Sequence, residues 1–131
     1  FDRNFAFGHA DQRAQDAYQA VWESTEAGFA AIAPGATTTE VFQAMNKVLQ
    51  AHGSLGNDVG RLGHGLGMQV TEWPSHTAND DTVIEQNMVL TLEPGLLWAP
   101  GKAMVHEENL VVTAHGAQWL SRRAAPELPI I

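Results

Sequence analysis

The hydrophobic period of this chain changes at Gly53, and that change constrains its fold more than any other feature. Before Gly53, larger apolar residues recur every three or four positions in the stretches 11–33 and 36–52, which is typical of amphipathic helices. From Gly56 onward, the chain is rich in glycine, and the apolar stretches 87–98 and 103–116 are short and rich in β-branched residues. Two helices followed by antiparallel strands predict an α+β fold.

End signals agree with the two helices. Asp11 is a plausible N-cap of the first helix, which Pro34-Gly35 ends. Thr37 or Thr38 can cap the second helix. In the strand region, Pro-Gly pairs at 94–95 and 100–101 are expected to interrupt the strands.

Both ends of the chain carry distinct patterns. Residues 1–7 alternate, with Phe1, Arg3, Phe5 and Phe7 on one face, which predicts a strand. Because a domain rarely begins inside a strand, we expect the chain to be part of a longer protein. The end, SRRAAPELPII, is interrupted by prolines and is expected to pack across the surface or against another chain.

Composition excludes several functions. The length of 131 residues suits one domain, 1–131, and the absence of cysteine excludes disulfides, thiolate metal sites and cysteine nucleophiles. A formal net charge of -8 argues against a nucleic-acid partner. No apolar run reaches membrane-spanning length and FDRNFAFG does not resemble a signal peptide, so we expect a cytoplasmic protein.

Three segments carry side chains that commonly bind metals. His64 lies in Gly63-His64-Gly65, Glu93 follows the apolar run MVLTL, and Glu107 lies in HEEN. An imidazole with carboxylates suits zinc, manganese, cobalt or iron. The glycines around His64 indicate that another part of the chain approaches this backbone closely.

Each residue also has a purely structural interpretation. His64 could be a turn histidine whose nitrogens the backbone satisfies. Glu93 could simply precede a Pro-Gly turn, and Glu107 with Glu108 could be a solvated pair on an edge strand. Taken one at a time, these interpretations are the simpler ones.

The order GHGLG, MVLTLEPG, HEENLVVT resembles the family of methionine aminopeptidase, aminopeptidase P, prolidase and creatinase. APGATTTEV, RNFAFG and the C-terminal segment are also similar to that family, so the resemblance covers essentially the whole chain. It implies the second half of a pita-bread domain, with two helices packed on a curved, mainly antiparallel sheet. The upstream metal-binding strands of that domain would be missing.

The resemblance also implies a mechanism. Family members hold two divalent ions, such as Mn, Co or Zn, which activate a water for hydrolysis. By motif, His64, Glu93 and Glu107 match metal ligands, and Glu93 matches the residue that passes a proton to the leaving amine. The implied reaction of an Xaa-Pro peptidase is removal of an N-terminal residue or dipeptide next to proline, with His64 and Glu93 as catalytic residues.

The chain departs from the family pattern at several positions. Two metal-binding aspartates would lie upstream of Phe1; Asp2 shares the face of one of them, but a surface acidic residue is the simpler interpretation. Thr71 stands where peptidases often have a substrate-binding histidine, and His76 lies nearby, so both are candidate substrate contacts. Val105 replaces an arginine that is common in prolidases.

These departures leave three functions open. The first is an Xaa-Pro peptidase, in which this chain alone is weak or inactive and holds one metal ion or none. The second is a creatinase-like hydrolase of non-peptide C–N bonds, and the third is a non-catalytic fold fragment. The expected partner is a short peptide or small amide, together with a second copy in a homodimer, because a half-domain exposes an apolar face. Neither nucleic acid nor membrane is expected.

Overall fold

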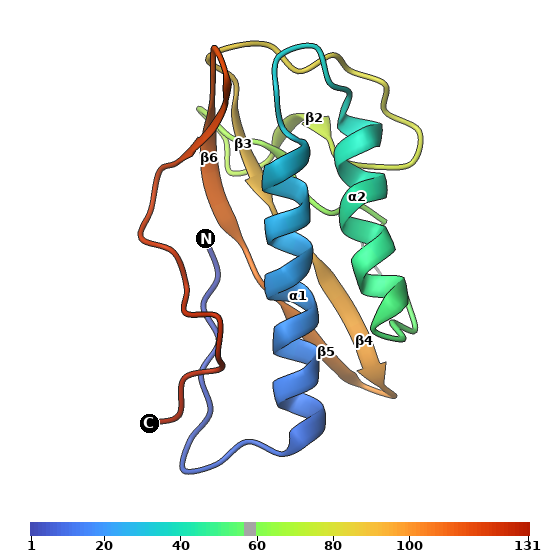
Figure 1. The fold of residues 1–131 in the computed structure, drawn as a ribbon, viewed down its shortest axis with the longest axis vertical. Coiled ribbons are helices and arrows are strands. Elements are labelled where there is room, and N and C mark those ends of the chain that lie inside the picture. The colour runs from blue at the N-terminus through green and yellow to red at the C-terminus, as the bar shows by residue number, and fades with distance from the viewer. Residues whose placement is uncertain (57–59) are drawn as a thin grey trace.

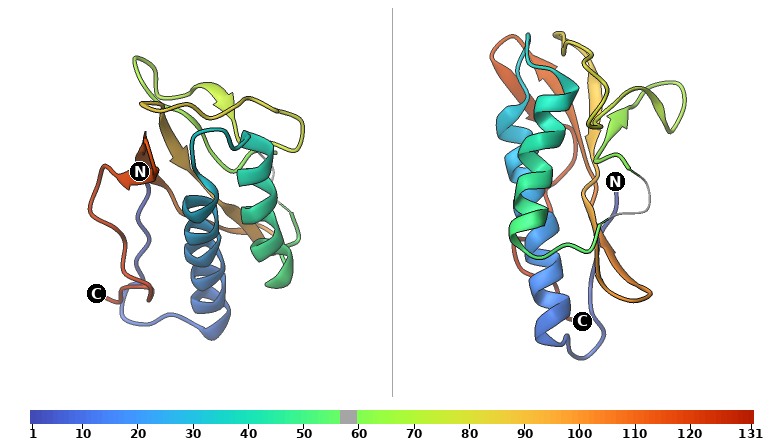
Figure 2. Two further views of the ribbon diagram at one scale, coloured as in Figure 1. Left: turned by 45° about the horizontal axis from the view of Figure 1, so that its top comes forward. Right: turned by 90° about the vertical axis from the view of Figure 1, so that its right-hand side faces the viewer.

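The computed structural model describes residues 1–56 and 60–131, which form two layers (Figure 1, Figure 2). Helices α1 (Gln12–Ala31) and α2 (Thr38–Ala51) lie side by side on one face of a five-stranded sheet with the order β2-β1-β3-β6-β7. Strands β4 and β5 form a separate hairpin, and all paired strands are antiparallel. The strands are β1 (His64–Gly65), β2 (Glu72–Ser75), β3 (Val89–Leu92), β4 (Gly95–Ala99), β5 (Lys102–Val105), β6 (Glu108–Thr113) and β7 (Gly116–Trp119). The predicted α+β fold is therefore confirmed.

The capping residues of both helices are among those that the sequence predicts. The Asp11 carboxylate accepts a hydrogen bond from the Ala14 amide at 2.8 Å, which satisfies a free N–H of the first turn. Thr37 caps α2 and forms a reciprocal capping box with Glu40. Gly53 follows the end of α2 with a φ of 74°, a conformation that favours glycine.

The core lies between the helices and the sheet. The Ser24 hydroxyl donates a hydrogen bond to the Met45 carbonyl at 3.1 Å and so ties α1 to α2. Within the described residues, neither helix combines the length and apolar character that a membrane-spanning segment requires. The largest apolar side chains that are fully buried are Tyr18, Val21, Met45, Leu49, Leu62, Ile84, Leu90, Leu92 and Leu110.

Two strand breaks face each other across the sheet. Leu92 pairs with Glu108 and Gly95 pairs with Val105, so the segment 93–94 lies opposite 106–107. Pro94 breaks the first strand as expected, because it has no N–H for the ladder. The second break, at residues 106–107, contains no proline or glycine. It follows from the interruption of the opposite strand at Pro94. We call these four residues the junction.

The N-terminal strand prediction is wrong. The structure has no strand at residues 1–7, only a parallel bridge between Ala6 and Ile130, and the rings of Phe1, Phe5 and Phe7 are exposed. The neighbour of this segment is the C-terminal segment 120–131, whose prolines lack the N–H groups that a continuous ladder needs. The two segments run side by side along α1 (Figure 1), so the C-terminal segment packs across the surface of its own chain.

Candidate metal centre

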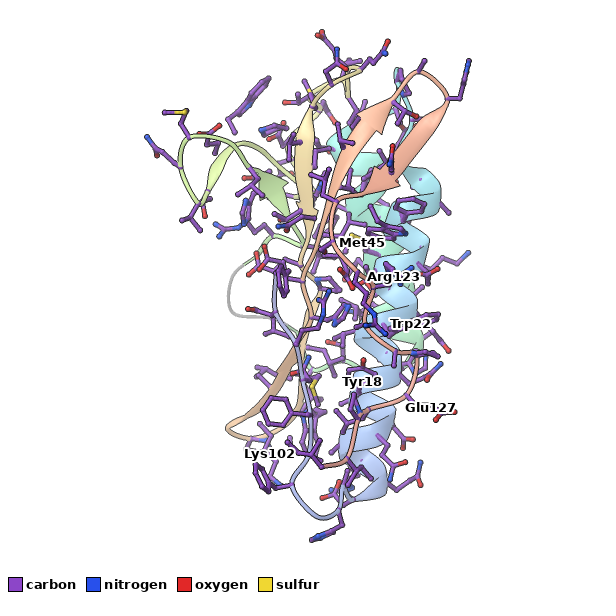
Figure 3. All side chains as sticks on the ribbon, turned by 90° about the vertical axis from the view of Figure 1, so that its left-hand side faces the viewer. Tyr18, Trp22, Met45, Lys102, Arg123 and Glu127 are labelled. Atoms are coloured by element: carbon purple, nitrogen blue, oxygen red, sulfur yellow. The ribbon has the colours of Figure 1, made fainter. Side chains whose placement is uncertain are left out.

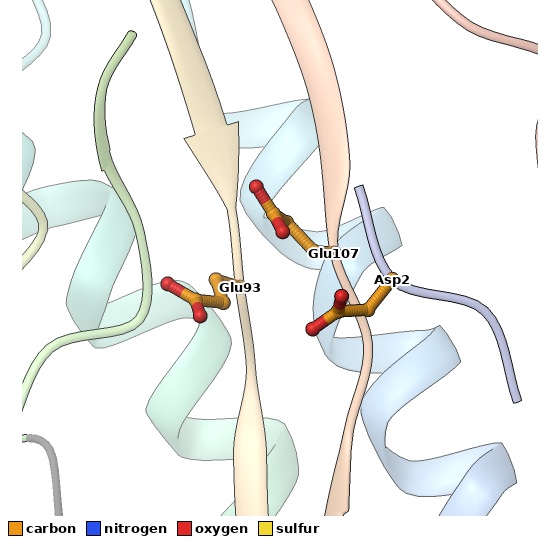
Figure 4. Close-up of side chains that lie close together, drawn as sticks. All are labelled: Asp2, Glu93 and Glu107. Atoms are coloured by element: carbon orange, nitrogen blue, oxygen red, sulfur yellow. The ribbon is translucent and has the colours of Figure 1, made fainter. Parts of the chain in front are cut away.

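The junction places Glu93 and Glu107 on neighbouring chain segments. Both side chains lie on the sheet face that is turned away from the helices (Figure 4). Their exposed fractions are 26% and 16%, so both carboxylates are largely withdrawn from water. The Glu93 amide donates a hydrogen bond to the Leu62 carbonyl at 2.8 Å, which brings the segment before His64 next to the junction.

Asp2 supplies a third carboxylate. One oxygen each of Asp2, Glu93 and Glu107 lie within 4.8 Å of one another (Figure 4). The Asp2 amide donates a hydrogen bond to the Glu107 carbonyl at 3.3 Å. The interpretation of Asp2 as a surface acidic residue therefore misses its convergence on the junction, although the residue as a whole is exposed. Strand alternation, which puts Asp2 on the face of a family ligand, was the one signal in the sequence.

The glycines around His64 are required by close backbone contacts. A Cβ on Gly63 would lie 2.2 Å from the Thr91 carbonyl oxygen, and a Cβ on Gly65 would lie 2.3 Å from the Trp73 carbonyl oxygen. No side chain fits at such distances. Gly63 also has a φ of 149°, which favours glycine. The sequence prediction of a close approach is confirmed, and β1 can lie between β2 and β3 because of it.

His64 itself is oriented by the backbone. Its ring is buried, and its Nδ1 lies 2.8 Å from the Gly65 carbonyl oxygen. Since a carbonyl only accepts, Nδ1 carries the proton, and in the neutral ring the lone pair belongs to Nε2. Nε2 faces Glu93 and lies 3.5 Å from its Oε2. A backbone carbonyl that fixes the ring in this way is the usual arrangement behind a metal-binding histidine.

The negative charges at the junction are incompletely compensated. Desolvation and the neighbouring Glu107 raise the pKa of Glu93, and His64 and Arg61 oppose this only in part. Among the described residues, Glu93 Oε2 has no hydrogen-bond partner although it is buried. An orphaned carboxylate oxygen beside two more carboxylates and an imidazole lone pair fits a divalent cation that prefers oxygen and nitrogen ligands. His64 lies beside the three-carboxylate group rather than within it.

The two candidate substrate contacts lie in different environments. Thr71 is exposed just before β2, whereas His76 is completely buried just after it. The His76 amide donates to the Gly63 carbonyl at 2.9 Å, and its ring occupies the space that a Cβ on Gly63 would need. Burial lowers the pKa of His76 to about 4, so the ring is neutral at physiological pH. His76 supports the turn behind His64, and substrate contact by either residue stays a prediction.

Glu108 has a different environment from Glu107, so their interpretation as a solvated pair is wrong. Strand alternation turns Glu108 to the helix side, where it is completely buried. Burial opposes its ionisation, but contacts with His106, the Ala124 amide and Arg3 outweigh this and lower the pKa of Glu108 to about 2. No local pattern in the sequence signals this network, because its members lie far apart in the chain.

A two-layer fold with carboxylates and an imidazole at a strand junction is compatible with a metal-dependent hydrolase, and comparisons with known proteins identify the family. The model of metallopeptidase family M24 matches residues 1–114, so the chain belongs to this family. Its resemblance to the pita-bread peptidases is thereby confirmed.

Individual relatives agree. The Xaa-Pro dipeptidase of Pyrococcus furiosus is 28% identical over 92% of this chain and 34% of its own length. The crystal structure of dipeptidase PepE from Mycobacterium ulcerans superposes with a TM-score of 0.88 at 30% identity, over 98% of this chain and 34% of that chain. The dipeptidase of Pyrococcus horikoshii gives 0.89 at 28% identity, over 98% of this chain and 36% of that chain. The chain thus spans about a third of the length of the curated relatives it matches.

Proposed function

We propose that this chain is the C-terminal part of the catalytic domain of a metal-dependent Xaa-Pro peptidase, which removes an N-terminal residue or dipeptide next to proline. The observation that carries the proposal is the convergence of the Asp2, Glu93 and Glu107 carboxylates within 4.8 Å. The adjacent His64 lone pair and the Xaa-Pro dipeptidase among the relatives support it.

The residues would divide the work as follows. His64 Nε2 and the three carboxylates would hold divalent ions, Mn, Co or Zn, two of them in the complete protein. When bound, the metal polarises the scissile carbonyl and lowers the pKa of water. Glu93 would accept a proton from the attacking water and deliver it to the leaving amine, because its unpartnered oxygen faces the centre. Thr71 and His76 are kept as candidate substrate contacts.

The relatives are about three times as long as this chain, which supports the proposal that residues 1–131 complete a domain begun upstream. Upstream aspartates would add ligands, so the isolated chain would bind metal weakly and have little activity. Manganese as the resident metal and a cytoplasmic location remain predictions.

Metal content tests the proposed centre first. The 131-residue chain is incubated with manganese, cobalt or zinc, excess metal is removed, and bound metal is measured by elemental analysis. We expect Glu107→Gln and Asp2→Asn to lose bound metal, and the exposed Glu85→Gln to retain it. Equal metal binding by the wild-type chain and all three variants would contradict a metal centre here.

Substrate choice tests the reaction. The full-length protein is assayed with Xaa-Pro dipeptides, longer peptides with proline in second position, and small amides and amidines. Turnover of the proline peptides supports the proposal. The exposed Thr71 and Val105, at positions where prolidases often carry histidine and arginine, favour the creatinase-like alternative, which turnover of small amidines alone would establish. The third alternative, a non-catalytic fold fragment, concerns the 131-residue chain itself, and measurable dipeptide turnover by that purified chain would contradict it.

A homodimer remains part of the proposal. Three large apolar side chains around the β1–β2 turn are exposed: Met68 by 99%, Val70 by 82% and Trp73 by 70%. Exposed apolar side chains that lie together often mark a protein–protein interface. Light scattering at micromolar concentration checks this, and a monomer would contradict it.

A further inference from the structure

The guanidinium of Arg3 contacts the main chain of two of the three carboxylate-bearing residues, Asp2 and Glu107. Its Nη1 donates hydrogen bonds to the carbonyl of Asp2 at 2.8 Å and to the carbonyl of Glu107 at 3.0 Å. These are main-chain contacts, so they fix the positions of two segments rather than the charge of their side chains. Asp2 has no strand around it, and its other main-chain bond is the long one to Glu107.

The other half of the same guanidinium is held from the helix side. Its Nη2 donates to Glu108 Oε2 at 2.8 Å and to the Arg122 carbonyl at 2.7 Å. The planar guanidinium donates to four acceptors at once. This fixes its position and orientation more narrowly than a lysine ammonium, which acts as a point charge, could be fixed. Arg3 thereby connects the carboxylate group on one sheet face with the buried Glu108 on the other.

Glu108 in turn is held by the C-terminal segment. Its Oε1 accepts from the Ala124 amide at 2.9 Å, and its Oε2 accepts from the Ser121 hydroxyl at 3.2 Å. That segment is fixed to α1, because the Tyr18 hydroxyl donates to the Ala125 carbonyl at 2.6 Å. Arg123 also lies between the rings of Trp22 and Trp119. Figure 3 shows Tyr18, Trp22 and Arg123 where the C-terminal segment runs along α1.

We propose that Arg3 is a positioning residue of the metal centre: anchored by Glu108 and residues 120–131, it holds the Asp2 and Glu107 segments at the spacing that a shared cation requires. The presence of a cation rests on the proposed function, whereas the positioning by Arg3 rests on the hydrogen bonds described above. The competing role is purely structural, in which Arg3 only neutralises Glu108.

Arg123 provides the matched control for this distinction. It is a second arginine facing Glu108, with Nε 3.7 Å from Oε1, and its side-chain exposure of 24% is close to the 27% of Arg3. Its partner on the other side is Glu26, and among the described residues it makes no hydrogen bond or ion pair with Asp2 or Glu107. The variants Arg3→Lys and Arg123→Lys both keep a positive charge near Glu108, but only the first removes the fork that reaches the junction.

The first measurement needs no metal. Backbone ¹⁵N relaxation of the 131-residue chain reports the order of the Asp2 amide. We expect its order parameter to fall from about 0.8 to below about 0.6 in Arg3→Lys and to stay unchanged in Arg123→Lys. An unchanged Asp2 in Arg3→Lys would overturn the positioning role, whatever the metal does.

The second measurement uses Co²⁺ as the probe, followed by its visible absorption, with urea unfolding to compare stability. We expect Arg3→Lys to bind Co²⁺ at least about tenfold more weakly, while Arg123→Lys binds within about twofold of wild type at a similar loss of stability. Equal affinities of the two variants would support the purely structural role and overturn the proposal. Failure of the wild type to bind Co²⁺, with Asp2 still loosened in Arg3→Lys, would refute the metal centre and leave the positioning intact.

Discussion

Glu107 and Glu108 are neighbours in the chain, yet they belong to two regions with opposite electrostatics. The Glu107 side chain lies on the sheet face turned away from the helices, beside the carboxylates of Asp2 and Glu93. Among the described residues, Glu93 Oε2 has no hydrogen-bond partner there. Glu108 faces the helices, where an arginine, an amide and a hydroxyl bind its two oxygens. The alternation of a strand separates these environments by a single residue.

The difference separates residues that stabilise the fold from residues that await a ligand. A buried charge with a full set of partners contributes to the folded state, and its removal is costly. The Glu93 and Glu107 carboxylates are partly buried, and their ionic partners, the His64 ring and the Phe1 amino group, lie no closer than 3.5 Å. Carboxylates crowded together in this way oppose folding unless a cation binds them. Substitutions on the two sides should therefore affect different measurements.

The largest effect is expected for Glu93→Gln in the full-length protein. The amide keeps the shape of the side chain but cannot accept a proton, so kcat/KM should fall by about 10³-fold. The free energy of unfolding should stay equal or rise, because the neighbours that destabilise the charged form of Glu93 include Glu107 and Asp2. Steady-state kinetics and urea unfolding check this. Activity within about tenfold of wild type would show that Glu93 takes no part in proton transfer.

The second prediction compares Glu108→Ala with Glu107→Ala. Glu108→Ala should lower the free energy of unfolding by about 3 kcal/mol, since it leaves Arg3 and the Ala124 amide without their buried partner. Glu107→Ala should change it by less than about 1 kcal/mol. Urea unfolding of both variants measures the difference. Equal losses would mean that the two faces are not distinct in energy.

Sequence reasoning identified one side of this comparison better than the other. The helices, their caps and the Pro94 break follow from local patterns, and His64, Glu93 and Glu107 follow from motifs. Asp2, Arg3 and Glu108 depend on contacts more than a hundred positions apart, such as Arg3 to Glu108 and to Arg122, which no local pattern encodes. The strand predicted at residues 1–7 failed for the same reason, because its neighbour is the proline-containing C-terminal segment.

The third prediction uses pH to probe the interior behind the junction. Because burial lowers the pKa of His76 from 6.5 to about 4, the folded chain excludes a proton that the unfolded chain binds. Above pH 6.5 the ring is neutral in both states. As pH falls from 6.5 toward 4, only the unfolded state takes up the proton, so the free energy of unfolding decreases by about 3 kcal/mol. His76→Gln should lack this part of the acid loss. The wild-type minus variant difference in unfolding free energy, measured from pH 7 to 4, isolates it, and a difference independent of pH would show that His76 is not held neutral.

The smallest effect on the free energy of unfolding is expected for alanine substitutions at Gly63 and Gly95, which lie before His64 and after Glu93. Gly63→Ala places a Cβ 2.2 Å from the Thr91 carbonyl oxygen and 2.5 Å from the His76 ring, so β1 must move away from β3. This should lower the free energy of unfolding by about 2 kcal/mol and displace His64 from Glu93. Gly95→Ala is the control, because its nearest neighbour would be the Val105 side chain at 3.4 Å, and its stability should change by less than about 1 kcal/mol. Co²⁺ binding by the two variants gives the second comparison. Loss of Co²⁺ binding in Gly63→Ala alone would show that the close packing around His64 is needed for the metal centre. Binding like the wild type by both variants would show that this packing only stabilises the sheet.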